Sequence, residues 1–365
     1  MRSWGSVGHY IQGPGVLADV RRYADRFGGS HLFLVDSYVQ GLLAPALYAA
    51  YDDDDVYETV LFEGDITRHS VERIETRIGD GFDVIISVGG GTVIDVAKMI
   101  ASKKHVALVV CPTIASTDAP TSAMSILYSD EGEMNEIVIH RANPDLVLVD
   151  TRVIAAAPRR FLISGIGDAL STYYEGLSND HTGHANYVWC DTGQGRASIA
   201  GRAIARACFE TLFADAPAAL VACDLKVPTP AFENVVEANI LLSGIGFENV
   251  GCSIAHGIGN AITAIPEGER AMHGERVAFG TLCLLIAEDY PAEEIDRVIS
   301  FCVRCGLPIT FGALGLDPSR EDLEKIAEAA LAAESWAASP TAICDVAGVV
   351  DLMRVADALG CVAHL

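Results

Sequence analysis

Residues 83–98 read DVIISVGGGTVIDVAK. The apolar run at 83–88 stops at three glycines, and a segment with helical spacing begins directly after them. A strand, a glycine turn and a helix in this order are typical of a parallel α/β sheet. Similar apolar and β-branched runs at 31–36, 106–110 and 146–150 predict three further strands that are covered on both faces.

The second half of the sequence has a different pattern. After Pro158 the β-branched runs nearly disappear, and long Ala- and Leu-rich segments such as 196–214 and 322–336 have helical periodicity. The polar segment 178–195 contains glycines and predicts a surface loop or a helix connection. We therefore predict an α/β plus all-α protein, with a parallel-sheet nucleotide-binding domain at 1–158 and an all-helical metal-binding domain at 159–365.

Composition excludes several classes of protein. A formal net charge of -24 on 365 residues repels phosphate backbones, so we expect no nucleic-acid partner. A membrane span and a secretory signal are not expected, which favours a cytoplasmic location. The ten cysteines are expected to be mostly buried thiols, and Cys302 and Cys305 to be two positions on one helix rather than half of a zinc site. The aspartate run 52–55 is expected to be solvated rather than to bind a metal.

The glycine turn is a candidate phosphate site. Gly89, Gly90 and Gly91 would let the backbone approach a pyrophosphate, and the following helix would supply unpaired N–H groups. The segment is neither a GxGxxG nor a P-loop motif, and a turn without a ligand would have the same sequence. Asp36, at the end of an earlier strand, could bind a ribose diol and favour NAD over NADP, or could be an ordinary turn aspartate.

A second polar turn follows the strand at 106–110. Residues 112–123 place several hydroxyls around the single carboxylate of Asp118, at the carboxyl end of a strand where α/β proteins bind ligands. The hydroxyls could hold cofactor groups, and Asp118 could accept hydrogen bonds from substrate hydroxyls. Ordinary turn chemistry is the alternative interpretation.

Three segments of the helical half each contain one candidate metal ligand: Asp168, His256 and His273. Two histidines and one carboxylate form a known catalytic zinc set with an open position for water or substrate. Glycines at 167, 257 and 274 are expected to leave room for a ligand beside each of them. Each histidine could instead be a hydrogen-bonded core residue, because the three ligands are far apart in the sequence.

Together these segments resemble the glycerol dehydrogenase branch of the iron-containing alcohol dehydrogenase superfamily over about residues 8–330. The matching stretches are Gly89–Lys98, Pro112–Glu133, Gly165–Leu170, Glu237–Asn239, Ser243–Glu248, Thr263–Pro266 and His273–Gly280. The resemblance implies a two-domain fold, a closed homo-oligomer that is often an octamer, and a divalent metal held by Asp168, His256 and His273.

The resemblance also implies the residues that contact cofactor and substrate. It implies NAD contacts at Asp36, Gly89, Gly90, Gly91, Thr113, Ser116, Ser122, Met124 and Tyr128, and we expect Thr92, directly after the glycines, to contact the cofactor as well. It implies a polyol contact at Asp118, with Phe247 near the pocket. The expected reaction is hydride transfer from a small polyol, most simply glycerol giving dihydroxyacetone, to NAD, with the metal as Lewis acid.

A few positions depart from the family pattern. Thr172 stands where the iron-type enzymes have an extra histidine, which leaves three protein ligands and favours zinc, although iron and manganese stay open. Thr92 replaces a frequent lysine, Trp336 to Pro340 replaces a His-Asn-Met-Pro-like segment, and the 177–196 connection is longer than usual. These changes leave another polyol or an aminocyclitol open as substrate, and a non-catalytic regulator that binds NAD and metal is the alternative from a different class.

Overall fold

The structure is a computed structural model that describes residues 1–52, 55–129 and 134–362. Asp53 and Asp54 of the aspartate run and the end of the Pro112–Glu133 stretch lie outside these residues. Asp55 pairs with Arg21 at 2.5 Å, and Asp52 is exposed. Among the described residues, no helix combines the length and the apolar character needed to cross a bilayer.

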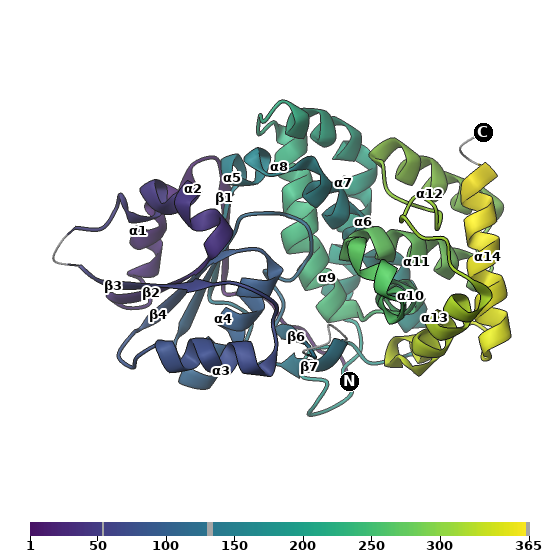
Figure 1. The fold of residues 1–365 in the computed structure, drawn as a ribbon, viewed down its shortest axis with the longest axis horizontal. Helices are drawn as coiled ribbons and strands as arrows, with labels where there is room; N and C mark the ends of the chain where they lie inside the picture. The colour runs from purple at the N-terminus through teal and green to yellow at the C-terminus, as the bar shows by residue number, and fades with distance from the viewer. Residues whose placement is uncertain (53–54, 130–133, 363–365) are drawn as a thin grey trace.

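The first 150 residues form a six-stranded, fully parallel sheet in the order β1-β8-β5-β4-β2-β3 (Figure 1). Its strands are β1 (His9–Gly13), β2 (Ser30–Asp36), β3 (Val56–Phe62), β4 (Val84–Gly89), β5 (Ala107–Pro112) and β8 (Leu146–Asp150). The four strands predicted from the sequence are confirmed as β2, β4, β5 and β8. The edge strands β1 and β3 were not predicted, nor was the antiparallel hairpin of β6 (Met124–Tyr128) and β7 (Met134–Ile139).

Alternation along the strands divides the sheet side chains between two cores. In β2, Leu32 and Leu34 point to one face, and Phe33 and Val35 point to the other. One core is closed by η1 (Val16–Asp19), α1 (Val20–Ala24) and α2 (Ser37–Tyr48), and the other by α3 (Arg68–Arg77) and α4 (Gly91–Lys104). Burial of both faces explains why these strands are continuous apolar runs rather than alternating ones.

In the described residues after Asp150, every named element is a helix, and this half appears in teal, green and yellow in Figure 1. The helices are α5 (Thr151–Ala156), α6 (Arg159–Thr182), α7 (Ile199–Asp224), α8 (Pro230–Glu237), η2 (Ala238–Leu242), α9 (Ser243–Val250), α10 (Ile254–Ala261), η3 (Ile262–Ala264), η4 (Pro266–Arg270), α11 (His273–Ala287), α12 (Ala292–Cys305), α13 (Arg320–Ala332), η5 (Glu334–Ala338) and α14 (Val346–Val362). The division into two domains at residue 158 stays a prediction.

Local chemistry sets helix boundaries that differ from the predicted ones. Ser198 caps α7 by accepting a hydrogen bond from the Gly201 N–H, so this helix begins at residue 199 rather than at 196. The predicted helix at 322–336 is α13, which ends at residue 332 and is followed by the short helix η5. Cys302 and Cys305 are buried on α12, as expected.

The predicted loop at 178–195 was partly wrong. Helix α6 continues to Thr182 and ends where Gly183 adopts a left-handed conformation (φ 71°). Asn186 is buried and accepts a hydrogen bond from Ser3, so the segment is not simply a surface loop.

Candidate active site

A cavity of about 950 Å³ opens between the carboxyl end of the sheet and the helical half. A volume of this size suits a dinucleotide or a drug-sized ligand. Nine of the expected site residues line it: Asp36, Gly90, Gly91, Thr92, Thr113, Ser116, Asp118, Tyr128 and His273. Turns after β2, β4 and β5 therefore meet the start of α11 around one space.

The glycine turn presents backbone N–H groups to this cavity. β4 ends at Gly89, Gly90 is the N-cap of α4, and the helix starts at Gly91. A Cβ on Gly89, whose φ is 155°, would lie 2.4 Å from Val93 Cγ1 and 2.8 Å from Asp36 Cβ, so only glycine fits there. In the described structure no side chain caps the first turn of α4, which leaves its N–H groups available to an anion.

Asp36 lies beside this turn at the end of β2. One of its carboxylate oxygens accepts the Tyr38 N–H at 2.9 Å and caps α2. The ordinary turn role that was the alternative interpretation is therefore present. Because the side chain also lines the cavity, capping does not exclude a contact with a ribose.

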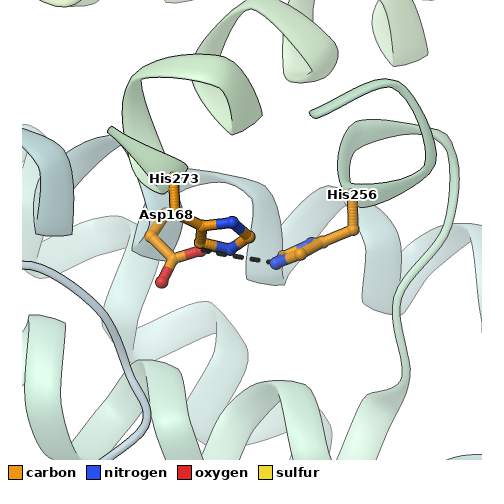
Figure 2. A group of neighbouring side chains, drawn as sticks. All are labelled: Asp168, His256 and His273. Carbon is orange, nitrogen blue, oxygen red and sulfur yellow. Dashed lines mark ion pairs between the residues drawn. The ribbon is translucent and has the colours of Figure 1, made fainter. Parts of the chain in front are cut away.

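Helix packing brings the three candidate metal ligands together. Asp168 lies within α6, His256 lies on α10, and His273 is the first residue of α11. The Nε2 atoms of His256 and His273 are each 3.3 Å from Asp168 Oδ1 (Figure 2). One ligand atom from each residue lies within 4.8 Å of the others.

Asp168 Oδ1, the oxygen between the two histidines, is buried at the centre of this group. Asp168 is 1 % exposed, and within the described part of the chain its Oδ1 has no hydrogen-bond partner. Burial by itself would raise the pKa of Asp168, but its interactions with His273 and His256 lower it below its usual range. A buried, ionised oxygen that faces two imidazole nitrogens fits the donor set of a divalent metal.

Two glycines allow the helices that carry Asp168 and His273 to approach each other closely. A Cβ on Gly274 would lie 1.8 Å from the Ser164 carbonyl oxygen, and one on Gly167 would lie 2.3 Å from the Gly274 carbonyl oxygen. The expectation that these glycines leave room for a ligand was therefore wrong, since they allow α6 and α11 to pack in backbone contact. A Cβ on Gly257 would meet the side chain of Ser335 at 3.3 Å.

Asp118 connects the polar turn after β5 to this group. Its backbone N–H donates to Asp168 Oδ2 at 3.3 Å, and its Oδ2 accepts the Ser243 hydroxyl at 3.0 Å. Burial raises the pKa of Asp118 well above its usual range, and the charge of Asp168 adds to that effect. Thr172 shares a 3.1 Å hydrogen bond with Ser243, so its hydroxyl is directed to this network.

Comparison with known proteins identifies the fold family. The profile described as iron-containing alcohol dehydrogenase matches residues 11–158. The glycerol dehydrogenase of Thermotoga maritima is 39 % identical over 325 residues, which cover 88 % of each chain. The chain belongs to the iron-containing alcohol dehydrogenase family.

Solved structures of this family agree. A probable glycerol dehydrogenase from Sinorhizobium meliloti 1021 is 39 % identical, with a TM-score of 0.92 over 99 % of each chain. Glycerol dehydrogenase from Schizosaccharomyces pombe is 36 % identical, with a TM-score of 0.94 over 100 % of this chain and 92 % of that one. The expected α/β plus helical fold and the expected kinship with glycerol-dehydrogenase-type alcohol dehydrogenases are confirmed. Family membership also supports NAD and a metal ion, and the family description names iron rather than zinc.

Some residues that the family resemblance assigned to cofactor or substrate do not line the cavity. Ser122 and Met124 are buried behind the turn, where the Ser122 hydroxyl and the Met124 carbonyl oxygen accept hydrogen bonds from Lys98 Nζ. Phe247 lies on α9 and packs with Met124, Cys252 and Tyr187. These three residues support the site from behind, and their direct contacts stay predictions.

Two segments that depart from the family pattern also lie behind the cavity. Trp336 is buried in η5, donates its indole N–H to the Ile343 carbonyl oxygen at 3.1 Å, and lies 3.8 Å from the Cβ position of Gly257 on α10. Tyr187 of the long connection packs against Phe247. Both segments therefore contact helices that carry expected site residues, since α10 carries His256 and α9 carries Phe247.

Ser243 and Glu175 were not predicted as site residues. Ser243 was quoted as part of a matching stretch, and only the fold shows that it reaches Asp118. Glu175 lies seven positions after Asp168, on the same side of α6, and contacts His256. That helical spacing was the signal for Glu175 in the sequence.

Proposed function

We propose that this member of the family oxidises a small polyol, with glycerol giving dihydroxyacetone, and uses NAD as hydride acceptor and one divalent metal. The observation that carries the proposal is the Asp168, His256 and His273 group, whose His273 lines the same cavity as Gly90 and Gly91 of the glycine turn. The glycerol dehydrogenases of Thermotoga maritima and Escherichia coli, 39 % and 38 % identical to this chain, support the choice of substrate. The relatives do not favour the non-catalytic alternative.

Zinc is the metal that we propose. Asp168 Oδ1 and two imidazole nitrogens would hold it, and three protein ligands leave an open position for a substrate oxygen. The Thr172 hydroxyl is engaged with Ser243 and adds no fourth ligand. When bound, the metal supplies a Lewis acid that lowers the pKa of an alcohol, and NAD supplies the hydride acceptor.

The protein residues orient the reactants. The free N–H groups at the start of α4 would bind the pyrophosphate, and Asp36 would accept hydrogen bonds from the adenosine ribose, which favours NAD over NADP. Asp118 would accept a hydrogen bond from a polyol hydroxyl adjacent to the reacting carbon. The Ser243 hydroxyl fixes the carboxylate of Asp118 for this contact.

The test is NADH formation, followed by absorbance, with zinc-loaded protein and a panel of glycerol, 1,2-propanediol, 2,3-butanediol and cyclitols. Turnover of glycerol or 1,2-propanediol, lost on chelation and restored by zinc, is the expected result. His256→Ala should abolish turnover while it retains NAD binding, measured by calorimetry. Wild-type turnover in that variant would refute the metal site. Turnover of a cyclitol alone would keep the mechanism but make a cyclitol, rather than glycerol, the substrate.

One relative favours a second candidate reaction. Glycolaldehyde reductase of Halobacterium salinarum is 38 % identical over 88 % of this chain. The same site could reduce glycolaldehyde with NADH, because hydride transfer is reversible and a two-carbon hydroxyaldehyde needs the same contacts. The ratio of kcat/KM for glycolaldehyde reduction to that for glycerol oxidation decides between the two. The homo-oligomeric state and the cytoplasmic location stay predictions, which light scattering and cell fractionation would test.

A further inference from the structure

Glu175 is a fully buried carboxylate that no step of the proposed reaction uses. It lies on α6 and is 0 % exposed. Its Oε1 accepts the backbone N–H groups of Ser253 at 2.7 Å and His256 at 2.9 Å. Its Oε2 lies 2.6 Å from His256 Nδ1.

These contacts hold both the backbone and the ring of His256. Ser253 is the N-cap of α10, yet in the described structure its own hydroxyl is buried without a hydrogen-bond partner. Glu175 replaces that cap, because it accepts the N–H of the third residue of the helix, His256. A carboxylate from α6 therefore fixes the first turn of α10 at the point where the metal ligand projects.

The contact to the ring determines which nitrogen carries the hydrogen. An ionised carboxylate only accepts hydrogen bonds, so His256 Nδ1 must donate to Glu175. In a neutral imidazole the lone pair then lies on Nε2, the atom that is 3.3 Å from Asp168 Oδ1. The ring is thus held in the tautomer that a metal at Asp168 requires.

Hydrogen bonding also distinguishes between two groups of residues that could hold a metal ion. Glu175, Cys252 and His256 offer ligand atoms within 4.8 Å of one another, as Asp168, His256 and His273 do. The oxygens of Glu175 already accept three N–H groups, whereas Asp168 Oδ1 accepts none from the described residues. An ion at Glu175 would have to displace those donors, so the ion belongs at Asp168 and Glu175 has a supporting role.

We propose that Glu175 is a positioning residue that holds His256 as its Nδ1–H tautomer and thereby increases the affinity of the protein for its divalent metal. This inference rests on the metal site of the proposed function. Hydrogen-bond partners of this kind orient metal-bound histidines and increase their basicity.

Glu175→Gln tests the tautomer while it preserves the size of the side chain. If the amide oxygen keeps the two backbone N–H groups, the amide nitrogen faces Nδ1 and can only donate. Nδ1 must then accept, and the ring hydrogen moves to Nε2, where it faces Asp168. We expect the zinc affinity of the metal-free full-length variant, measured by competition with a chromophoric chelator, to fall by about 10–100-fold.

Glu248→Gln is the matched control. Glu248 is a buried carboxylate on α9 that accepts hydrogen bonds from Asn143 and the Ala123 N–H. Above about pH 7, where Glu248 is ionised, removing its charge should leave the zinc affinity within about twofold, because in the described structure its side chain is hydrogen-bonded to Asn143 and Ala123 rather than to a proposed ligand. An equal loss of affinity in both variants would refute the inference in favour of a general charge effect.

A measurement on the wild type avoids any folding defect of the variant. In zinc-loaded protein labelled with ¹⁵N-histidine, the His256 resonance should show a hydrogen on Nδ1 and metal on Nε2. Hydrogen on Nε2, or an unchanged zinc affinity in Glu175→Gln, overturns the role of Glu175 and leaves the proposed function standing. Failure of the wild type to bind any divalent metal overturns both.

Discussion

Replacing Lys98 with Met removes a buried cation from beneath the substrate turn. Lys98 is 3 % exposed. Its Nζ donates to Asp95 Oδ1 at 3.0 Å, the Ala119 carbonyl oxygen at 2.6 Å, Ser122 Oγ at 3.2 Å and the Met124 carbonyl oxygen at 2.7 Å. One side chain thus anchors α4 to the turn that follows Asp118.

The expected loss of stability follows from these partners. Methionine replaces the methylene chain but donates no hydrogen bond, so Asp95 would be a buried carboxylate without its cation. Breaking such a pair by removing one partner costs about 3–5 kcal/mol. The two carbonyl groups add about 1–3 kcal/mol each if they stay unpaired. Relaxation of the turn and protonation of Asp95, whose pKa burial raises, offset part of this, so we expect a loss of about 4 kcal/mol.

Urea denaturation followed by circular dichroism measures this loss. Lys103→Met is the control, because Lys103 lies on the same helix and pairs with Glu75 at a position where its side chain is 68 % exposed. That control should lose less than about 1 kcal/mol. The double variant Lys98→Met with Asp95→Asn should recover part of the loss. If Lys98→Met is no less stable than Lys103→Met, the buried network does not stabilise the turn.

Further predictions concern helix packing, pH and substrate binding. Gly274→Ala should destabilise the protein by more than about 3 kcal/mol in thermal melts, because its Cβ would lie 1.8 Å from a carbonyl oxygen of α6. Gly41 lies in α2 with open space around it in the described structure, so Gly41→Ala should instead stabilise the protein by about 0.5–1 kcal/mol. A stabilising Gly274→Ala together with a destabilising Gly41→Ala would refute the packing argument. Burial raises the pKa of Glu248 from 4.5 to about 7, so the folded protein favours the protonated form of this carboxyl. The resulting contribution to stability, up to about 3 kcal/mol, is fully present below pH 4.5 and is lost as pH rises through about 7. Glu248→Gln should remove that part of the pH dependence of unfolding, and an unchanged profile would contradict it. Ser243→Ala should raise the KM for glycerol about tenfold and leave the affinity for NAD unchanged, since the two groups that lose a hydrogen bond are Asp118 and Thr172, and neither is an expected NAD contact.

The inner strands of the sheet could be predicted because both of their faces are buried. β2 and β8 are continuous apolar runs, and the sequence pattern is sufficient to find them. β1 and β3 lie at the two edges of the sheet, are only partly buried and have no comparable run. Their pairing with distant strands depends on the assembled sheet, which a local pattern does not encode.

The residue types that form the candidate metal site could be predicted from the sequence, but their proximity in the folded protein could not. Asp168, His256 and His273 belong to three helices, and their distances depend on the close contact between Gly167 and Gly274. The sequence pattern suggested a spacious environment around these glycines, whereas the structure uses them for backbone contact. Buried polar residues such as Lys98 and Glu175 were missed because their partners come from other elements.

The two oxygens of Asp168 have different neighbours, since Oδ1 faces the histidines and Oδ2 accepts the Asp118 N–H. One rigid carboxylate therefore couples the metal position to the turn that would bind the polyol. By thermodynamic reciprocity, any factor by which metal tightens polyol binding is the factor by which polyol tightens metal binding. Enzyme saturated with substrate should consequently resist chelators better than idle enzyme. When metal is scarce, the molecules that are turning over substrate would be the last to lose it.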